Sequence, residues 1–302
     1  MMQDRGHLLT EARNSGSRAI DTMDVEDAFD VVSAEDATIA AAVAVAKPSI
    51  CAAVRVVTDA LSRGGRLFYV GAGTSGRLGV LDAAECPPTF LTDPAMIQGI
   101  IAGGYEALHR SIEGAEDHAQ DGVAAIDGKS IGRGDVVIGI ATGGTTPFVH
   151  GAIQRARECG AGTVFLACVP ADQVSDHADV SIRVLTGPEV ITGSTRMKAG
   201  TATKMVLNMI STLTMVGLGK VYQNLMVDVN TRACAKLVDR GVRVLTDVLG
   251  IPRSDASALL ERADGNVKSA IVMHWCGVDQ YEARRRLASC GGRIRPVIAA
   301  AE

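Results

Sequence analysis

Residues 66–78 decide the fold of this chain: Arg66-Leu67-Phe68-Tyr69-Val70-Gly71-Ala72-Gly73-Thr74-Ser75-Gly76-Arg77-Leu78. An apolar run typical of a buried strand meets a turn with three glycines and two hydroxyls, and a helical pattern follows over residues 77–85. This order forms an anion site, because the first helical N–H groups point at the anion and the helix dipole favours negative charge. The residues that we expect to bind a phosphate are Gly73, Thr74, Ser75 and Gly76.

The same glycines match the spacing of the dinucleotide-binding fingerprint. A nicotinamide site also needs an acidic residue at the end of the second strand, but the next apolar run, residues 96–102, ends in Gly103-Gly104. The Gly-x-x-x-x-Gly-Lys-Ser/Thr loop of nucleoside triphosphate sites does not occur either. A phosphate monoester on a small molecule fits better, although these residues alone also allow a tight turn without a ligand.

The composition indicates a globular α/β protein with a large core. The chain has 302 residues, of which 47% are apolar and 3% aromatic, enough for one large domain and a small extra one. Its net charge is −4, and no basic block indicates nucleic-acid binding. The longest apolar helical stretch, residues 39–46, is too short to span a bilayer, and residues 1–13 contain no apolar signal region. We therefore expect a cytoplasmic protein that binds neither nucleic acid nor membrane.

The cysteines and histidines give no sign of a metal site. The 7 cysteines are scattered and never form Cys-x-x-Cys, and the 6 histidines never form His-x-x-x-His. We expect free, mostly buried thiols, no metal and no organic cofactor.

Strand and helix patterns alternate after residue 66. The strand-like runs are residues 67–70, 97–102, 136–141, 164–168 and 180–185, and the helical patterns between them are 77–86, 105–126 and 148–159. This alternation predicts an α/β fold, a parallel sheet flanked by helices. Ligands of such sheets bind beyond the carboxyl ends of the strands.

A second turn rich in glycine and hydroxyls follows the third strand-like run, Thr142-Gly143-Gly144-Thr145-Thr146-Pro147. Because the carboxyl ends of parallel strands share one edge, the two turns together predict a phosphate cradle. The residues expected to contribute are Thr142, Gly144, Thr145 and Thr146. Ordinary turn chemistry explains the second turn equally well.

A third polar stretch, residues 192–201, opens a long helix. We expect Ser194 and Lys198 near an anion, again through a helix N-terminus. An apolar stripe on that helix, formed by Ala202, Met205, Met209, Leu213 and Val216, predicts either core packing or a dimer interface.

The chain divides at Ile251-Pro252 in this interpretation. Residues 1–250 form the large domain that contains the phosphate turns, and this domain begins with an irregular arm that has a short helix near residues 25–32. Residues 251–302 form a bundle of three short helices, the first capped by Ser254 and the third by Asp279.

Two carboxylates are candidate acid–base groups. Glu85 precedes Pro87-Pro88, which we expect to end the helix, so it lies where the helix dipole opposes its charge. Burial would then raise its pKa and make it a general acid, whereas an exposed position would leave it a surface residue. Glu116 lies in an acidic cluster, and such a cluster is more often a solvated helix face than a catalytic site.

Several stretches resemble the N-acetylmuramic acid 6-phosphate etherase family. They are residues 71–79, 82–89, 113–117, 192–201 and 224–229, and the likeness runs from about Thr10 to the C-terminal helices. The resemblance implies a sugar-isomerase domain with a ubiquitin-associated-like tail, a homodimer, and cleavage of the D-lactyl ether of a phosphosugar without metal or cofactor. It assigns the proton donor to Glu85 and the second catalytic carboxylate to Glu116.

The second turn departs from the family, which usually reads Ala-Ser-Gly-Arg-Thr-Pro where this chain has residues 142–147. A serine is replaced by Gly143 and an arginine by Thr145. Two other functions stay open: a non-catalytic phosphosugar sensor of the glucokinase-regulatory-protein type, and an aldose–ketose isomerase. Only the etherase requires both glutamates as a working pair.

Overall fold

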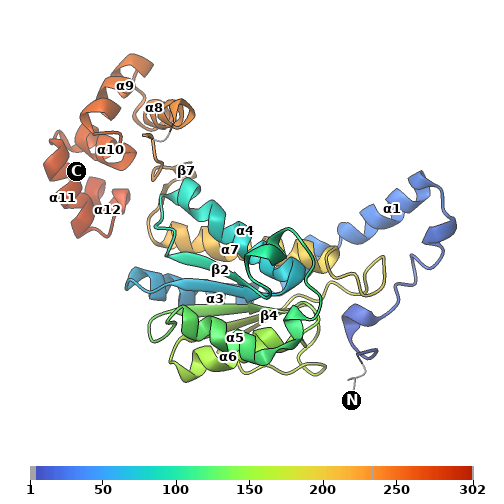
Figure 1. The fold of residues 1–302 in the computed structure, drawn as a ribbon. Helices are drawn as coiled ribbons and strands as arrows, with labels where there is room; N and C mark the ends of the chain where they lie inside the picture. Colours follow the sequence, from blue (N-terminus) through green and yellow to red (C-terminus); the bar gives the residue numbers. More distant parts are fainter. Residues whose placement is uncertain (1–4, 233, 301–302) are drawn as a thin grey trace. The chain divides into compact units, whose positions relative to one another are not determined.

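The computed structural model describes residues 5–232 and 234–300 and contains one parallel sheet of five strands (Figure 1). The strand order is β2-β1-β3-β4-β5. The strands are β1 (Leu67–Gly71), β2 (Ile97–Ile101), β3 (Val136–Ile140), β4 (Gly162–Ala167) and β5 (Val180–Arg183). Each overlaps one of the predicted runs, so the α/β prediction is confirmed.

The chain forms two compact units, the first made of Met1–Ala84 with Ala95–Ser211 and the second of Glu85–Pro94 with Thr212–Glu302. The first contains the sheet. Its helical segments are α1 (Val25–Asp36), α2 (Ile39–Val45), α3 (Lys47–Ser62), α5 (Ala119–Gly128) and α6 (Pro147–Glu158), together with the first parts of α4 (Gly73–Phe90) and α7 (Lys198–Gly217).

Helices α5 and α6 cover one face of the sheet (Figure 1). The packing there is tight: a β-carbon added to Gly139 of β3 would lie 2.7 Å from Val149 of α6. Alternate strand residues face the other side. On that side Tyr69 Oη donates to Asp82 of α4 over 2.8 Å, and Asn208 of α7 donates to the same carboxylate over 2.6 Å. This buried network fixes α4 and α7 against the sheet.

One helix prediction at the carboxyl edge of the sheet is wrong. The continuous helix expected over residues 105–126 is instead a loop with two short 3-10 turns, η3 (Tyr105–Leu108) and η4 (Ala115–Asp117), before α5 begins. Glycines explain the break, because Gly103, Gly104 and Gly114 all adopt positive φ.

The prolines at the end of α4 also act differently from the prediction. Pro87 and Pro88 lie inside the helix, which continues to Phe90. Without their N–H groups the helix loses two backbone hydrogen bonds, and the chain leaves it at Leu91, whose φ is 51°. The prolines therefore end the helix within a turn rather than at once.

The second unit combines the β6–β7 hairpin (Val221–Tyr222, Leu225–Met226) with short helices. These are α8 (Ala235–Leu249), α9 (Arg253–Arg262), α10 (Val267–Cys276), α11 (Gln280–Ser289) and α12 (Ile294–Ala299). Four helices thus follow residue 251 in the described chain, one more than predicted. Asp279 caps α11 as predicted, whereas Ser254 lies inside α9 rather than at its cap.

The core of the second unit joins helices from both sides of residue 250. Val242 and Leu245 of α8 pack in one cluster with Leu259 and Ile271. Beside it, Lys268 Nζ donates to Asp228 over 2.6 Å, and burial lowers the pKa of Lys268 although Asp228 opposes this shift.

Among the described residues, no single helix is long and apolar enough to cross a membrane. One bent helix pair, residues 25–45 and 47–62 at 61°, reaches that length and composition together.

Candidate active site

The first turn depends on glycine for close backbone contact. A β-carbon added to Gly71 would lie 2.7 Å from the backbone nitrogen of Gly76, and one added to Gly76 would lie 2.7 Å from the carbonyl oxygen of Gly71. Gly73, with φ of 51°, begins α4. The tight turn thus directs the first N–H groups of α4 toward the carboxyl edge of the sheet, where they have no acceptor within the helix.

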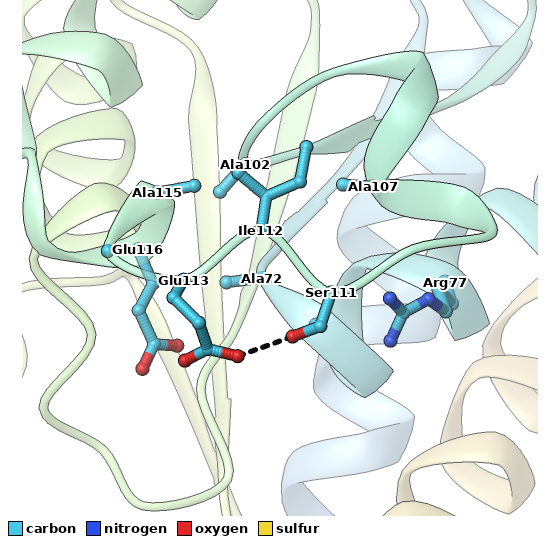
Figure 2. A pocket seen from close by; sticks show the side chains of 11 residues that line it. Ala72, Arg77, Ala102, Ala107, Ser111, Ile112, Glu113, Ala115 and Glu116 are labelled. Carbon is cyan, nitrogen blue, oxygen red and sulfur yellow. Dashed lines mark hydrogen bonds between the residues drawn. The ribbon is translucent and has the colours of Figure 1, made fainter.

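The start of α4 opens into a cavity of about 150 Å³ that also holds Glu116 (Figure 2). Gly73 lines it from the turn, and Glu113 and Glu116 line it from the loop between β2 and α5. The two carboxylates extend from this loop in the same direction (Figure 2), and both residues are exposed. Separated by about 40 residues in the sequence, the predicted anion turn and the predicted base therefore lie at one site.

Two residues of this cavity were missed from the sequence. Arg77 donates to the carbonyl oxygens of Leu108 and Arg110 over 3.1 and 2.9 Å, so its guanidinium holds the loop against α4. Ser111 Oγ donates to Glu113 over 2.6 Å, which orients that carboxylate (Figure 2). The position of Arg77, directly after the glycine turn, was the signal that could have revealed it.

The second turn lies at the end of the strand next to β1. Gly71 of β1 pairs with Ile140 of β3 on one side and Ile101 of β2 on the other. From β1 the chain continues to β2 on one side and then crosses to β3 on the other side of β1, so the topological switch point lies between β1 and β3. Ligands of such sheets bind at this point. The two predicted turns, residues 71–76 and 142–146, therefore flank this crevice.

The second turn is held by hydrogen bonds to the protein. His150 Nε2 lies 2.6 Å from the carbonyl oxygen of Gly144, and Cys168 N–H donates to that of Thr142 over 2.8 Å. Burial raises the pKa of the Cys168 thiol to about 12, so this cysteine is a structural residue rather than a nucleophile. Thr145 lines a separate cavity of about 300 Å³ with Arg5 and His7.

The start of α7 was predicted to bind an anion of the substrate, but a carboxylate of the protein itself binds there. Glu189 is fully buried, and its two oxygens accept the N–H groups of Lys198 and Ala199, each over 2.9 Å. The Lys198 ammonium, 3% exposed, pairs with Glu35. Hydrogen bonds from Asn14 and from Lys198 hold the pKa of Glu35 below its usual value. Glu189 had no signal in the sequence.

The third stretch nevertheless lies beside the first turn. A β-carbon added to Gly200 would lie 3.5 Å from the methyl group of Thr74. Ser194 and Thr146 are half-buried, and Ser75 is 8% exposed.

Glu85 lies near the end of α4, in the part that belongs to the second unit, and it is exposed. The burial that the acid assignment assumed is therefore not observed. The assignment of Glu85 as the acid therefore depends on the surrounding motif, residues 82–89.

Comparisons with known proteins agree with this architecture. The chain matches the model of the glucokinase regulatory protein N-terminal SIS domain over residues 49–157 and that of the SIS domain over residues 112–213. An N-acetylmuramic acid 6-phosphate etherase of Nostoc sp. is 55% identical over 99% of this chain and 97% of that protein. The protein of the same name from Synechococcus elongatus is 54% identical over 99% of this chain and 97% of its own length. Such identity over nearly the full length of both chains shows that this chain belongs to the N-acetylmuramic acid 6-phosphate etherase family.

Proposed function

We propose that the chain cleaves the D-lactyl ether of N-acetylmuramic acid 6-phosphate, with Glu116 as the base and Glu85 as the acid. The products are D-lactate and N-acetylglucosamine 6-phosphate. One observation carries the assignment of the base: Glu116 and the phosphate turn at Gly73 line the same cavity. A cavity of about 150 Å³ holds part of a phosphosugar, so the rest of the substrate extends beyond it.

The reaction proceeds by elimination and addition, because an alkyl ether is a poor target for direct attack by water. Ring opening exposes an aldehyde at C1, which acidifies the proton on C2. Glu116 removes this proton, the C3–oxygen bond breaks, and Glu85 protonates the departing lactyl oxygen. Water then adds at C3. In this mechanism the base Glu116 starts ionised and the acid Glu85 starts protonated.

The phosphate is held, in this proposal, by the first turn and by hydroxyls of the neighbouring turns. The start of α4 supplies N–H groups and the helix dipole, and Thr74 and Ser75 supply hydroxyl donors. Arg77 adds a positive charge in the cavity wall. The further ligands that we propose are Thr142, Gly144, Thr145, Thr146 and Ser194; the predicted ligand Lys198 is left out because its buried ammonium is paired with Glu35.

The direct test is to incubate the protein with N-acetylmuramic acid 6-phosphate in ¹⁸O-water and to measure D-lactate. We expect stoichiometric D-lactate and an ¹⁸O label at C3 of the sugar. A protein that binds the sugar but releases no lactate would be a sensor, and one that only forms a ketose would be an isomerase. A product that keeps its original C3 oxygen would show cleavage on the lactyl side of the ether.

We further propose that the active form is a cytoplasmic homodimer. On α7, Met209 is 38% and Leu213 45% exposed, although both belong to the predicted apolar stripe. A second copy covering this stripe would remove it from water. Sedimentation at micromolar concentration should give twice the chain mass, and a fully active monomer would contradict the proposal.

A further inference from the structure

The N-terminal arm is anchored along the carboxyl edge of the sheet. Leu8, 1% exposed, belongs to the main core, and the Leu9 N–H donates to Gln173 Oε1 over 2.9 Å. Farther along, Ser17 Oγ donates to the carbonyl oxygen of Val190 over 2.7 Å. These contacts fix the short 3-10 turn η1 (Leu9–Glu11) beside the loops that follow the strands.

Thr10, at the centre of η1, has a buried hydroxyl without a use in the fold. The residue is 1% exposed, and its Oγ1 has no hydrogen-bond partner in the described part of the chain. Buried hydroxyls are normally paired because an unpaired one has lost its water without compensation. The Thr10 hydroxyl is therefore a candidate hydrogen-bond donor to a bound ligand.

The hydroxyl of Thr10 lies beside the second turn. A β-carbon added to Gly143 would lie 3.6 Å from Thr10 Oγ1, an ordinary contact distance. Gly143 is thus the residue whose missing side chain leaves room next to this hydroxyl.

The surroundings of the turn favour an anion. The arm that carries Thr10 also supplies Arg5 and His7 to the cavity lined by Thr145. The carbonyl oxygens of Thr142 and Gly144 are engaged by Cys168 and His150, which fixes the turn. The turn thus shares a cavity with the Arg5 guanidinium, and a hydroxyl donor beside such a turn is suited to an oxyanion.

We propose that Thr10 Oγ1 donates a hydrogen bond to an oxyanion of the substrate bound against residues 142–146. The oxyanion is the phosphate or the lactyl carboxylate. This inference rests on the proposed function, since it names a further ligand of the same substrate.

The test compares Thr10→Val, which keeps the shape but removes the hydroxyl, with Thr10→Ser, which keeps the hydroxyl. Valine should raise KM for N-acetylmuramic acid 6-phosphate by roughly 10- to 100-fold, as expected for a lost hydrogen bond to a charged group. The melting temperature should stay the same or rise, because the unpaired group is gone. Serine should leave KM close to that of the wild type. Should valine disturb the packing, Thr10→Ala gives the same comparison.

Two ligands distinguish the sources of the oxyanion. N-acetylglucosamine 6-phosphate has the phosphate but no lactyl carboxylate, and unphosphorylated N-acetylmuramic acid has the carboxylate alone. If Thr10→Val weakens binding of the first, Thr10 contacts the phosphate; if it weakens only ligands that carry the lactyl group, Thr10 contacts the carboxylate.

A rescue experiment sharpens the test. Gly143 does not have positive φ, so Gly143→Ser is compatible with its backbone. In the Thr10→Val background it should recover part of the lost affinity. Suppose that the wild type releases lactate but Thr10→Val changes neither KM nor the affinity for either ligand. That result overturns this inference and leaves the proposed function intact. A wild type that binds neither phosphosugar overturns the proposed function and this inference with it.

Discussion

The N-termini of α4 and α7 come from similar sequences and have different surroundings. Both follow stretches rich in glycine, serine and threonine. The start of α4 lines a cavity with Glu116, whereas the first N–H groups of α7 donate to the buried carboxylate of Glu189. One helix end is available to a ligand, and the other is already satisfied by the protein.

The difference teaches that such a stretch identifies a helix N-terminus that needs an anion, but not which anion it receives. A carboxylate from the chain and a phosphate from the substrate satisfy the same N–H groups. The four predictions below test this contrast.

The largest effect should come from the carboxylate in the open cavity. Glu116→Gln keeps the shape but cannot accept the C2 proton, so lactate release should fall by roughly 10²- to 10⁴-fold while phosphosugar binding remains. Glu113→Gln is the matched control, because Glu113 lines the same cavity and is already bonded to Ser111. Equal losses in steady-state assays of the two variants would contradict the assignment of the base.

The satisfied helix end should matter for stability. Glu189→Ala leaves two buried N–H groups without an acceptor and should lower the free energy of unfolding by about 2–3 kcal/mol. Glu189→Gln retains one acceptor oxygen and should cost less. Denaturant unfolding of both variants measures this, and an alanine variant as stable as the wild type would show that the capping is dispensable.

Removing a hydroxyl at the open end should weaken binding. Ser75→Ala should reduce affinity for the phosphorylated sugar by about 1–3 kcal/mol, the cost of a lost hydrogen bond to a charged group. Ser194→Ala, at the occupied end, should reduce it less. Calorimetric titration gives both values. A larger loss from Ser194→Ala would reverse the contrast between the two helices.

The smallest effect concerns pH. The pKa of Glu35 is lowered from its usual 4.5 by the hydrogen bonds of Asn14 and Lys198. The stability that this pair contributes is therefore complete above pH 4.5 and is lost as the pH falls through the lowered folded-state pKa. Glu35→Gln should make unfolding midpoints less dependent on pH in that range. Parallel pH profiles of the two proteins would indicate that the pair contributes nothing.

The local pattern of the chain was sufficient to predict the strands and the first turn. Continuous apolar runs and the glycine spacing are local signals, so each strand of the parallel sheet was predicted, although the short β6–β7 hairpin was not. The need for glycine at Gly71 and Gly76 is explained by the close backbone contact in the turn. The helix predicted over residues 105–126 was wrong because it is broken at glycines with positive φ, such as Gly114. The sequence names these glycines but does not reveal their backbone conformation.

Contacts between distant parts of the chain were not accessible in this way. Nothing local indicates that Glu189 reaches the start of α7, that Glu35 meets Lys198, or that Thr10 lies beside Gly143. These contacts form only when the loops of the carboxyl edge assemble. Motifs were sufficient to name the candidate site residues. Whether a helix N-terminus is free for a ligand or already bonded to the protein could be seen only in the folded structure.

The elimination is tested most directly by running the reaction in deuterated water. Removal of the C2 proton by Glu116 and its return from solvent should leave deuterium at C2 of the N-acetylglucosamine 6-phosphate product, detected by NMR as loss of the C2 proton signal. Lactate release that leaves the original proton at C2 would contradict the elimination and the role of Glu116 in it.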